Sequence, residues 1–181
     1  MSTVPKRIVL VGLSGAGKST AGRLAAEQLA ARGTPWGFVD LDEEIERRAG
    51  RRVEEIFARQ GEAAFRKLER AVSQELHARE RLLLATGGGW VELGEVLGRF
   101  LADSELVYLR VSPAVAAARI GAEGGGRPLL AGPEPEIRLE KLLGRREAAY
   151  MQSQHTLSVD SMSPEQVASY IVALATADAG D

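Results

Sequence analysis

Residues 12–20 (GLSGAGKST) match the P-loop pattern G-x-x-x-x-G-K-[ST] at every defined position. A short run rich in β-branched residues precedes them at 7–11, and a run rich in Ala, Leu, Glu and Gln follows at 21–32. The first run is typical of a buried parallel strand and the second of a helix, which is the context that a phosphate-binding loop requires. The pattern therefore predicts a nucleoside triphosphate site, and disfavours the alternative of a glycine-rich turn without a ligand.

Each defined position of this loop has a physical task. Its glycines allow successive backbone N–H groups to turn inward around phosphate oxygens at the start of the following helix. Lys18 is expected to reach the β- and γ-phosphates, and the Ser19 hydroxyl can coordinate Mg²⁺. The remaining question is which molecule receives the phosphoryl group.

The composition excludes several other classes of protein. No apolar run approaches the roughly 20 residues that a membrane span needs, and the first residues lack the apolar segment of a secretory signal, so we expect a cytoplasmic protein without a membrane partner. The chain has no Cys, which excludes disulfides and a thiolate nucleophile. Its net charge of −2 gives no overall attraction to nucleic acid.

Strand-like and helix-like segments alternate along the 181 residues, which favours one α/β domain with a parallel sheet covered by helices on both faces. Beyond the first strand, we expect strands at 36–40, 81–86, 105–110 and 155–159. We expect further helices at 42–48, 53–59 and 62–79, from 112, at 134–150 and from 163. Residues 121–132 carry five glycines, a composition that predicts a mobile flap.

Two acidic residues and three glycines follow expected strands, where ligands gather in open α/β sheets. If strand alternation continued, Asp40 and Asp42 would point the same way, one toward a metal and the other into the cleft. Capping of the next helix by Asp42 is the alternative. The glycines at 87–89 predict a close approach of the backbone to a ligand rather than a plain turn, and Thr86 before them is placed to hold water around a metal.

Three arginines are candidates for anion binding. Arg146 falls on the apolar stripe of its helix, where a cation must either reach solvent or meet an anion. Arg66 lies outside the apolar stripe of its own helix and, taken alone, is expected on a solvated face. Arg127 lies in the glycine-rich flap, either as a surface cation or as a group that stabilises a transferring phosphoryl after closure.

In their order along the chain, these motifs resemble shikimate kinase. The resemblance rests on residues 12–20, Asp40-Leu41-Asp42, GEAAFRKLE at 61–69, the glycines at 87–89, RPLL at 127–130, and Arg146. It implies a three-layer P-loop fold like that of the nucleoside monophosphate kinases, with a five-stranded parallel sheet in the order 2-3-1-4-5. It also implies a single kinase domain over 1–181, with a substrate-binding helical region at about 42–79 and a lid at about 121–133.

The resemblance further implies a monomeric enzyme that uses ATP and Mg²⁺ to phosphorylate shikimate at its 3-hydroxyl, on the route to the aromatic amino acids. Carried over by position, the ATP-binding residues are Gly15, Ala16, Gly17, Lys18, Ser19, Thr20, Arg119 and Arg127. The shikimate-binding residues are Asp42, Arg66, Gly88, Gly89 and Arg146. Ser19 and Asp40 would bind Mg²⁺, and Lys18, Asp42 and Arg127 would be catalytic. Arg119 resembles the arginine that packs on the adenine.

The chain also departs from the family pattern. Trp90 follows the glycines where the family usually has a small residue, which predicts an altered pocket wall, and the proline usual two residues after Arg146 is missing. The alternatives are a P-loop kinase for another small hydroxy acid, such as gluconate, and a nucleotide-dependent regulatory module without turnover. The presence of Asp42, Arg66 and Arg146 disfavours the module, which has no need of groups for an acceptor.

Overall fold

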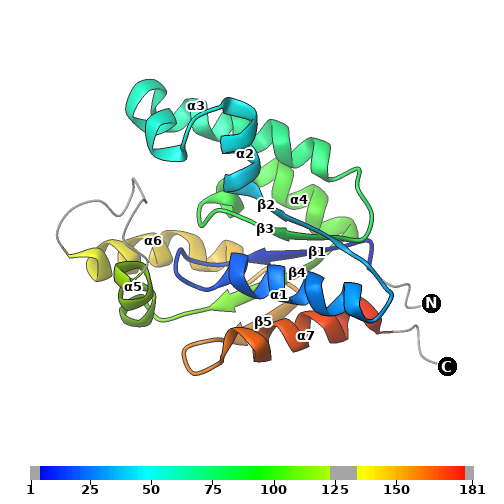
Figure 1. Cartoon of the computed structure of the whole chain (residues 1–181). Helices are drawn as coiled ribbons and strands as arrows, with labels where there is room; N and C mark the ends of the chain where they lie inside the picture. Colours follow the sequence, from blue (N-terminus) through cyan, green and yellow to red (C-terminus); the bar gives the residue numbers. More distant parts are fainter. Residues whose placement is uncertain (1–4, 123–133, 178–181) are drawn as a thin grey trace.

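The computed structural model describes residues 5–122 and 134–177, and within them the chain forms one parallel sheet (Figure 1). Its strands are β1 (Arg7–Val11), β2 (Gly37–Asp40), β3 (Leu82–Ala85), β4 (Glu105–Arg110) and β5 (His155–Ser158). All neighbouring pairs are parallel, and the order is β2-β3-β1-β4-β5. The predicted α/β class and strand order are therefore confirmed.

Helices cover the sheet on both faces, which gives the predicted three layers. They are α1 (Lys18–Ala31), α2 (Leu41–Ala49), α3 (Val53–Leu76), α4 (Gly94–Asp103), α5 (Pro113–Ala122), α6 (Pro135–Tyr150) and α7 (Pro164–Thr176), with the 3₁₀ turn η1 (Trp90–Glu92). Figure 1 shows α1 and α7 packed together on one side of the sheet, with α3 and α4 on the other. None of the helices in the described ranges is long and apolar enough to cross a bilayer.

The helix boundaries follow local sequence signals. The Ser163 side chain accepts a hydrogen bond from the backbone N–H of Gln166 and forms a capping box with it, while Pro164 occupies the first turn of α7. The two helices predicted on either side of Gly61 join into α3 with a kink at that residue, whose φ of 79° and ψ of 172° are non-helical.

Residues 90–104 carry no predicted element, yet η1 and α4 form there. Gly94 and Gly98 lower the helix propensity of this segment, which hides the helix from composition. Val96, Leu97 and Phe100 are buried, so packing against the rest of the protein outweighs the intrinsic preference of the segment.

The carboxyl ends of three adjacent strands lie level with one another. Ala85 of β3 pairs with Leu10 of β1 on one side and with Asp40 of β2 on the other. The P-loop after β1, the turn into α2 and the glycines after β3 therefore start from the same edge of the sheet. The predicted lid falls almost wholly outside the described residues, because only 121 and 122 are seen, at the end of α5; Arg127 also lies outside them.

Candidate active site

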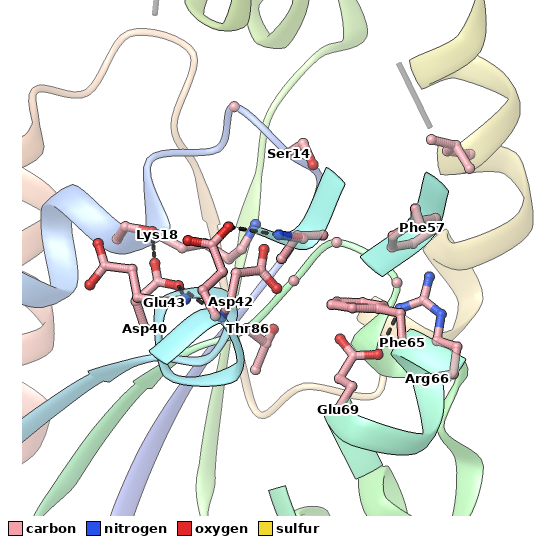
Figure 2. Close-up of a pocket in the computed structure, with 18 of the residues that line it drawn as sticks. Ser14, Lys18, Asp40, Asp42, Glu43, Phe57, Phe65, Arg66, Glu69 and Thr86 are labelled. Atoms are coloured by element: carbon pink, nitrogen blue, oxygen red, sulfur yellow. Dashed lines mark hydrogen bonds and ion pairs between the residues drawn. The ribbon is translucent and has the colours of Figure 1, made fainter. Parts of the chain in front are cut away.

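A cleft of about 370 Å³ opens at this edge of the sheet (Figure 2). It is lined by Ser14, Gly15, Gly17, Lys18, Ser19, Thr20, Asp40, Asp42, Glu43, Glu46, Arg52, Val53, Phe57, Phe65, Arg66, Glu69, Thr86, Gly87, Gly88, Gly89, Leu142 and Arg146. Lys18, Asp40 and Asp42 lie toward one end, and Phe57, Phe65 and Arg66 toward the other. The cleft therefore brings together nearly all of the predicted site residues that the structure describes.

The P-loop adopts the backbone shape that its glycines predict. Gly15 has a φ of 81°, and a Cβ at this position would lie 2.7 Å from the carbonyl oxygen of Ala116. The loop leads into α1 at Gly17, where no described side chain caps the helix. The amides of this helix start therefore remain available to an anion, as a phosphate site requires.

Lys18 is held beneath the loop. Its ammonium Nζ donates to the carbonyl oxygens of Gly12, at 2.8 Å, and Leu13, at 2.7 Å, and the side chain is buried. Both bonds point the lysine stem back along the loop rather than into solvent. The ammonium is thus placed on the inner side of the phosphate-binding turn.

The two predicted carboxylates are arranged differently from the sequence expectation. Asp40 ends β2 and is the N-cap of α2, because its Oδ1 accepts from the backbone N–H of Asp42 at 3.0 Å and of Glu43 at 3.1 Å. Both the capping by Asp42 and the continued strand alternation are therefore wrong, since the chain enters the helix at Leu41. Asp40 and Asp42 nevertheless both line the cleft.

Ser19 and Asp40, the two residues predicted to hold Mg²⁺, meet directly. The Ser19 hydroxyl donates to Asp40 Oδ2 next to Lys18. The described residues contain no cluster of three or more His, Cys, Asp or Glu side chains that would bind a metal alone. The Ser19 hydroxyl and the Asp40 carboxylate supply oxygen donors that suit Mg²⁺, which is usually bound by one or two protein oxygens together with substrate phosphates and water.

Arg66 points into the cleft instead of lying on a solvated face. Its Nη1 is 2.7 Å from Glu69 Oε2 and its Nη2 is 3.1 Å from Glu62 Oε1. The expectation of a solvated strip was wrong because Glu69 and Ser73, which share that strip of α3, are fully buried. The helix therefore buries a polar stripe in addition to its apolar one.

Arg146 meets an anion, which is one of the two outcomes expected for a cation on an apolar stripe. The residue is 4% exposed, and its Nε and Nη2 lie 2.9 Å and 2.7 Å from Glu92 Oε2. A Cβ on Gly88 would lie 3.7 Å from Arg146 Nη1, and one on Gly89 would lie 2.7 Å from Arg66 Cζ. The glycines thus form a turn between two guanidinium groups.

Comparison with known proteins matches this arrangement to a family. Residues 14–176 match the shikimate kinase family. The shikimate kinase of Gloeobacter violaceus is 45% identical over 157 residues, which cover 87% of this chain and 85% of that protein. The chain belongs to the shikimate kinase family. It is therefore a phosphotransferase that acts on shikimate, as the motifs predicted.

Solved structures of other proteins resemble this chain in fold. The shikimate kinase of Acinetobacter baumannii, determined in complex with shikimate, superposes with a TM-score of 0.86 and 34% identity over 94% of this chain and 92% of that one. A gluconokinase of Sinorhizobium meliloti superposes with a TM-score of 0.58 and 18% identity, covering 96% and 93% of the two chains. The second likeness shows a shared fold only.

Trp90, the departure from the usual family residue, does not belong to the cleft lining formed by the described residues. It is fully buried, its ring meets Phe100 edge-on at 5.3 Å, and its indole N–H donates to Ser73 Oγ at 2.9 Å. The Trp90 side chain itself is therefore not part of the pocket wall that the described residues form, and an altered wall stays a prediction. Trp90 instead ties the glycine turn to α3, the helix that carries Arg66.

We expect Trp90→Phe to lower the free energy of unfolding by about 1–3 kcal/mol, because the Ser73 hydroxyl loses its partner while the aromatic packing largely remains. Urea unfolding of the wild type, Trp90→Phe, Ser73→Ala and the double variant measures this. If the bond causes the loss, the double variant will lose less than the sum of the two single ones. Additive losses would show that the bond contributes nothing.

Sequence reasoning assigned Glu69 no role of its own, although it lines the cleft and is fully buried. Burial raises the pKa of Glu69 to about 7, even though the neighbouring Arg66 lowers it. The spacing of three residues between Arg66 and Glu69 was visible in the sequence, but it is equally common on solvated helix faces. Phe57, Phe65 and Leu142 also line the cleft and add an apolar wall, although sequence reasoning assigned them no role in the site.

This pKa predicts how stability depends on pH. Between the ordinary value of 4.5 and about 7, the folded protein holds a proton on Glu69 that the unfolded chain has released. Glu69 therefore lowers the free energy of unfolding as pH rises through this window. We expect the stability of the wild type relative to Glu69→Gln to be lower at pH 8 than at pH 5 in urea unfolding, and an equal difference at both pH values would contradict the assignment.

Two predicted ATP-binding residues lie outside the described lining of the cleft. Ala16 is buried within the loop. Arg119 donates to the carbonyl oxygens of Val159, at 2.8 Å, and Gly15, at 3.4 Å, and so connects the P-loop with the segment after β5. Its packing on the adenine stays a prediction.

Proposed function

We propose that the chain transfers the γ-phosphoryl group of ATP to the 3-hydroxyl of shikimate within this cleft, with Mg²⁺ as cofactor. The observation that carries the proposal is the pairing of a P-loop at one end of the cleft with Arg66 and Arg146 around a glycine turn at the other. The first end suits polyphosphate and the second suits a small carboxylate.

The donor end would hold ATP by backbone amides of residues 15–17 and by the side chains of Lys18, Ser19 and Thr20. Bound Mg²⁺ neutralises charge on the β- and γ-phosphates, and Ser19 and Asp40 are the residues that would hold it. Lys18, already directed to the inner side of the loop, would stabilise the charge on the transferring group. Arg127, outside the described residues, is proposed to add a second cation.

The acceptor end would hold shikimate by its carboxylate. Arg66 and Arg146 supply planar, fixed donors for that group, and the amides of Gly88 and Gly89 lie between them. Phe57 and Phe65, whose ring centroids are 4.9 Å apart, give the cleft an apolar wall for a carbocyclic ring.

Asp42 would orient the acceptor hydroxyl toward the γ-phosphate. It lies in the first turn of α2, between the donor residues and the glycine turn, and lines the cleft. Because the transition state of phosphoryl transfer is loose, the hydroxyl can lose its proton late, and positioning matters more than basicity. We also propose that the enzyme acts as a monomer in the cytoplasm. Sedimentation at assay concentrations would check the monomeric state.

A coupled assay of ADP release tests the proposal. We expect ADP release with ATP, Mg²⁺ and shikimate, and near-background rates with gluconate or without an acceptor. Faster turnover of gluconate would support the alternative, a P-loop kinase for another small hydroxy acid. The structural likeness to a gluconokinase supports only the shared fold. Binding of ATP without ADP release in any mixture would support a regulatory module.

A further inference from the structure

Glu92 stands out because it forms an ion pair with Arg146, the buried arginine of the cleft lining. It lies at the end of η1, three residues after Gly89, and is not among the described residues that line the cleft, whereas Arg146 is. Its carboxylate therefore lies outside the described lining of the cleft. The contact that links Glu92 to that lining is its ion pair with the Arg146 guanidinium.

The contacts between the two side chains determine which edge of Arg146 remains for a ligand. Glu92 Oε2 accepts from both Nε and Nη2, at 2.9 Å and 2.7 Å, and so occupies the side edge of the planar fork. Nη1 lies on the cleft side, 3.7 Å from the position of a Cβ on Gly88. The end edge of the guanidinium, formed by Nη1 and the second N–H of Nη2, is thus directed at the glycine turn, where the Tyr150 hydroxyl also hydrogen-bonds to Arg146.

The glutamate is itself fixed on both sides. Its other oxygen, Oε1, lies 2.8 Å from Arg145 Nη2. The preceding residues Trp90 and Val91 are buried, so η1 offers little freedom to the backbone of Glu92. The α6 helix is held against the same turn, because the Tyr150 hydroxyl donates to the carbonyl oxygen of Gly88 one helical turn beyond Arg146.

An ordinary surface ion pair would not have this geometry. Arg145 is 68% exposed and contributes little by itself, but Arg146 is 4% exposed, so its charge would be costly without a counter-charge. Burial raises the pKa of Glu92, but the two arginines outweigh it and hold the pKa below its usual range. The counter-charge is therefore present at neutral pH.

We propose that Glu92 is a positioning residue for the acceptor, which holds the side edge of Arg146 and thereby aims its end edge at the carboxylate site beside Gly88. The proposal rests on the proposed function, because it assumes that Arg146 binds the carboxylate of shikimate. An arginine side chain has four rotatable bonds, and fixing it before binding removes an entropic cost that the acceptor would otherwise bear.

Glu92→Gln tests the proposal because it keeps the shape but removes the charge. We expect the KM for shikimate to rise about tenfold, as for loss of a charged hydrogen bond, while kcat and the KM for ATP stay within about twofold. Glu95→Gln is the matched control, since Glu95 pairs with Arg99 at 2.8 Å on the exposed face of α4. An unchanged or lowered KM for shikimate in Glu92→Gln would overturn the proposal.

A double variant shows whether Glu92 acts through the arginine. Arg146→Lys keeps a charge but loses the planar fork. If Glu92 only positions Arg146, adding Glu92→Gln to Arg146→Lys will raise the KM for shikimate by less than twofold further. A full additional tenfold rise would show that Glu92 acts on the acceptor by another route, which also contradicts the proposal.

Folding and function have separate readouts. Thermal unfolding shows whether Glu92→Gln is folded at the assay temperature; if it is not, Glu92→Asp, which keeps the charge but withdraws it by one methylene, is used. We expect an intermediate rise in the KM for shikimate from Glu92→Asp, and a wild-type KM would overturn the proposal. A wild type that fails to phosphorylate shikimate would refute the proposed function, whereas an active wild type with unaffected Glu92 variants refutes only this inference.

Discussion

Replacing Lys18 with methionine is expected to lower kcat by about 100-fold or more, by analogy with the loss of other transition-state donors. The reason is geometric. The ammonium is buried beneath the P-loop, 2.8 Å and 2.7 Å from the carbonyl oxygens of Gly12 and Leu13, so it lies beside the turn that would hold the phosphates. Methionine keeps the apolar stem and removes the charge. Steady-state ADP release at saturating shikimate measures the effect.

Lys141→Met is the matched control, because Lys141 is exposed on α6 and is not among the described residues that line the cleft. We expect it to change kcat by less than twofold. Circular dichroism and thermal unfolding would establish that both variants are folded. A Lys18→Met enzyme with near-normal kcat and a raised KM for ATP would show that the lysine binds ATP equally in the ground state and the transition state, and would remove it from the catalytic assignment.

The sequence was sufficient for the parts of the fold that local signals control. The P-loop match set the strand before residue 12 and the helix after it, and runs of apolar residues marked β3 and β4 to within a residue. The positions of the loops then followed, because parallel strands present their carboxyl ends at one edge. This is why the predicted acidic and glycine motifs, distant along the chain, lie in one cleft.

Other features depend on which side chains meet across the fold, and no local pattern shows this. The polar strip of α3 is buried because the glycine turn and Trp90 pack against it, a contact with a residue 17 positions away. The bond between Arg146 and Glu92 spans 54 positions. Asp40 rather than Asp42 became the helix cap because the strand ended at Asp40, two residues sooner than alternation as far as Asp42 assumed. The arginines were thus predictable as candidates, but their carboxylate partners were not.

Gly89→Ala is expected to raise the KM for shikimate by about 100-fold, the effect of losing a strong charged contact. The backbone of Gly89, with φ of −94° and ψ of 0°, is open to alanine, so backbone strain is not the cause. The added Cβ would instead lie 2.7 Å from Arg66 Cζ and closer still to Nη2. Arg66 is held by Glu62 and Glu69, and we expect that moving its guanidinium away from the methyl group weakens these contacts and shifts it from the carboxylate site.

A control and a double variant separate this cause from general damage to the turn. Apart from its chain neighbours and the backbone of its own helix, no described atom lies within 4 Å of a Cβ on Gly94, so Gly94→Ala should leave the KM for shikimate within twofold of wild type. If the methyl group acts by displacing the guanidinium, Gly89→Ala should add less than twofold to the KM of an Arg66→Ala enzyme. A full 100-fold addition would mean that the turn itself binds the acceptor, because the displaced side chain would already be gone.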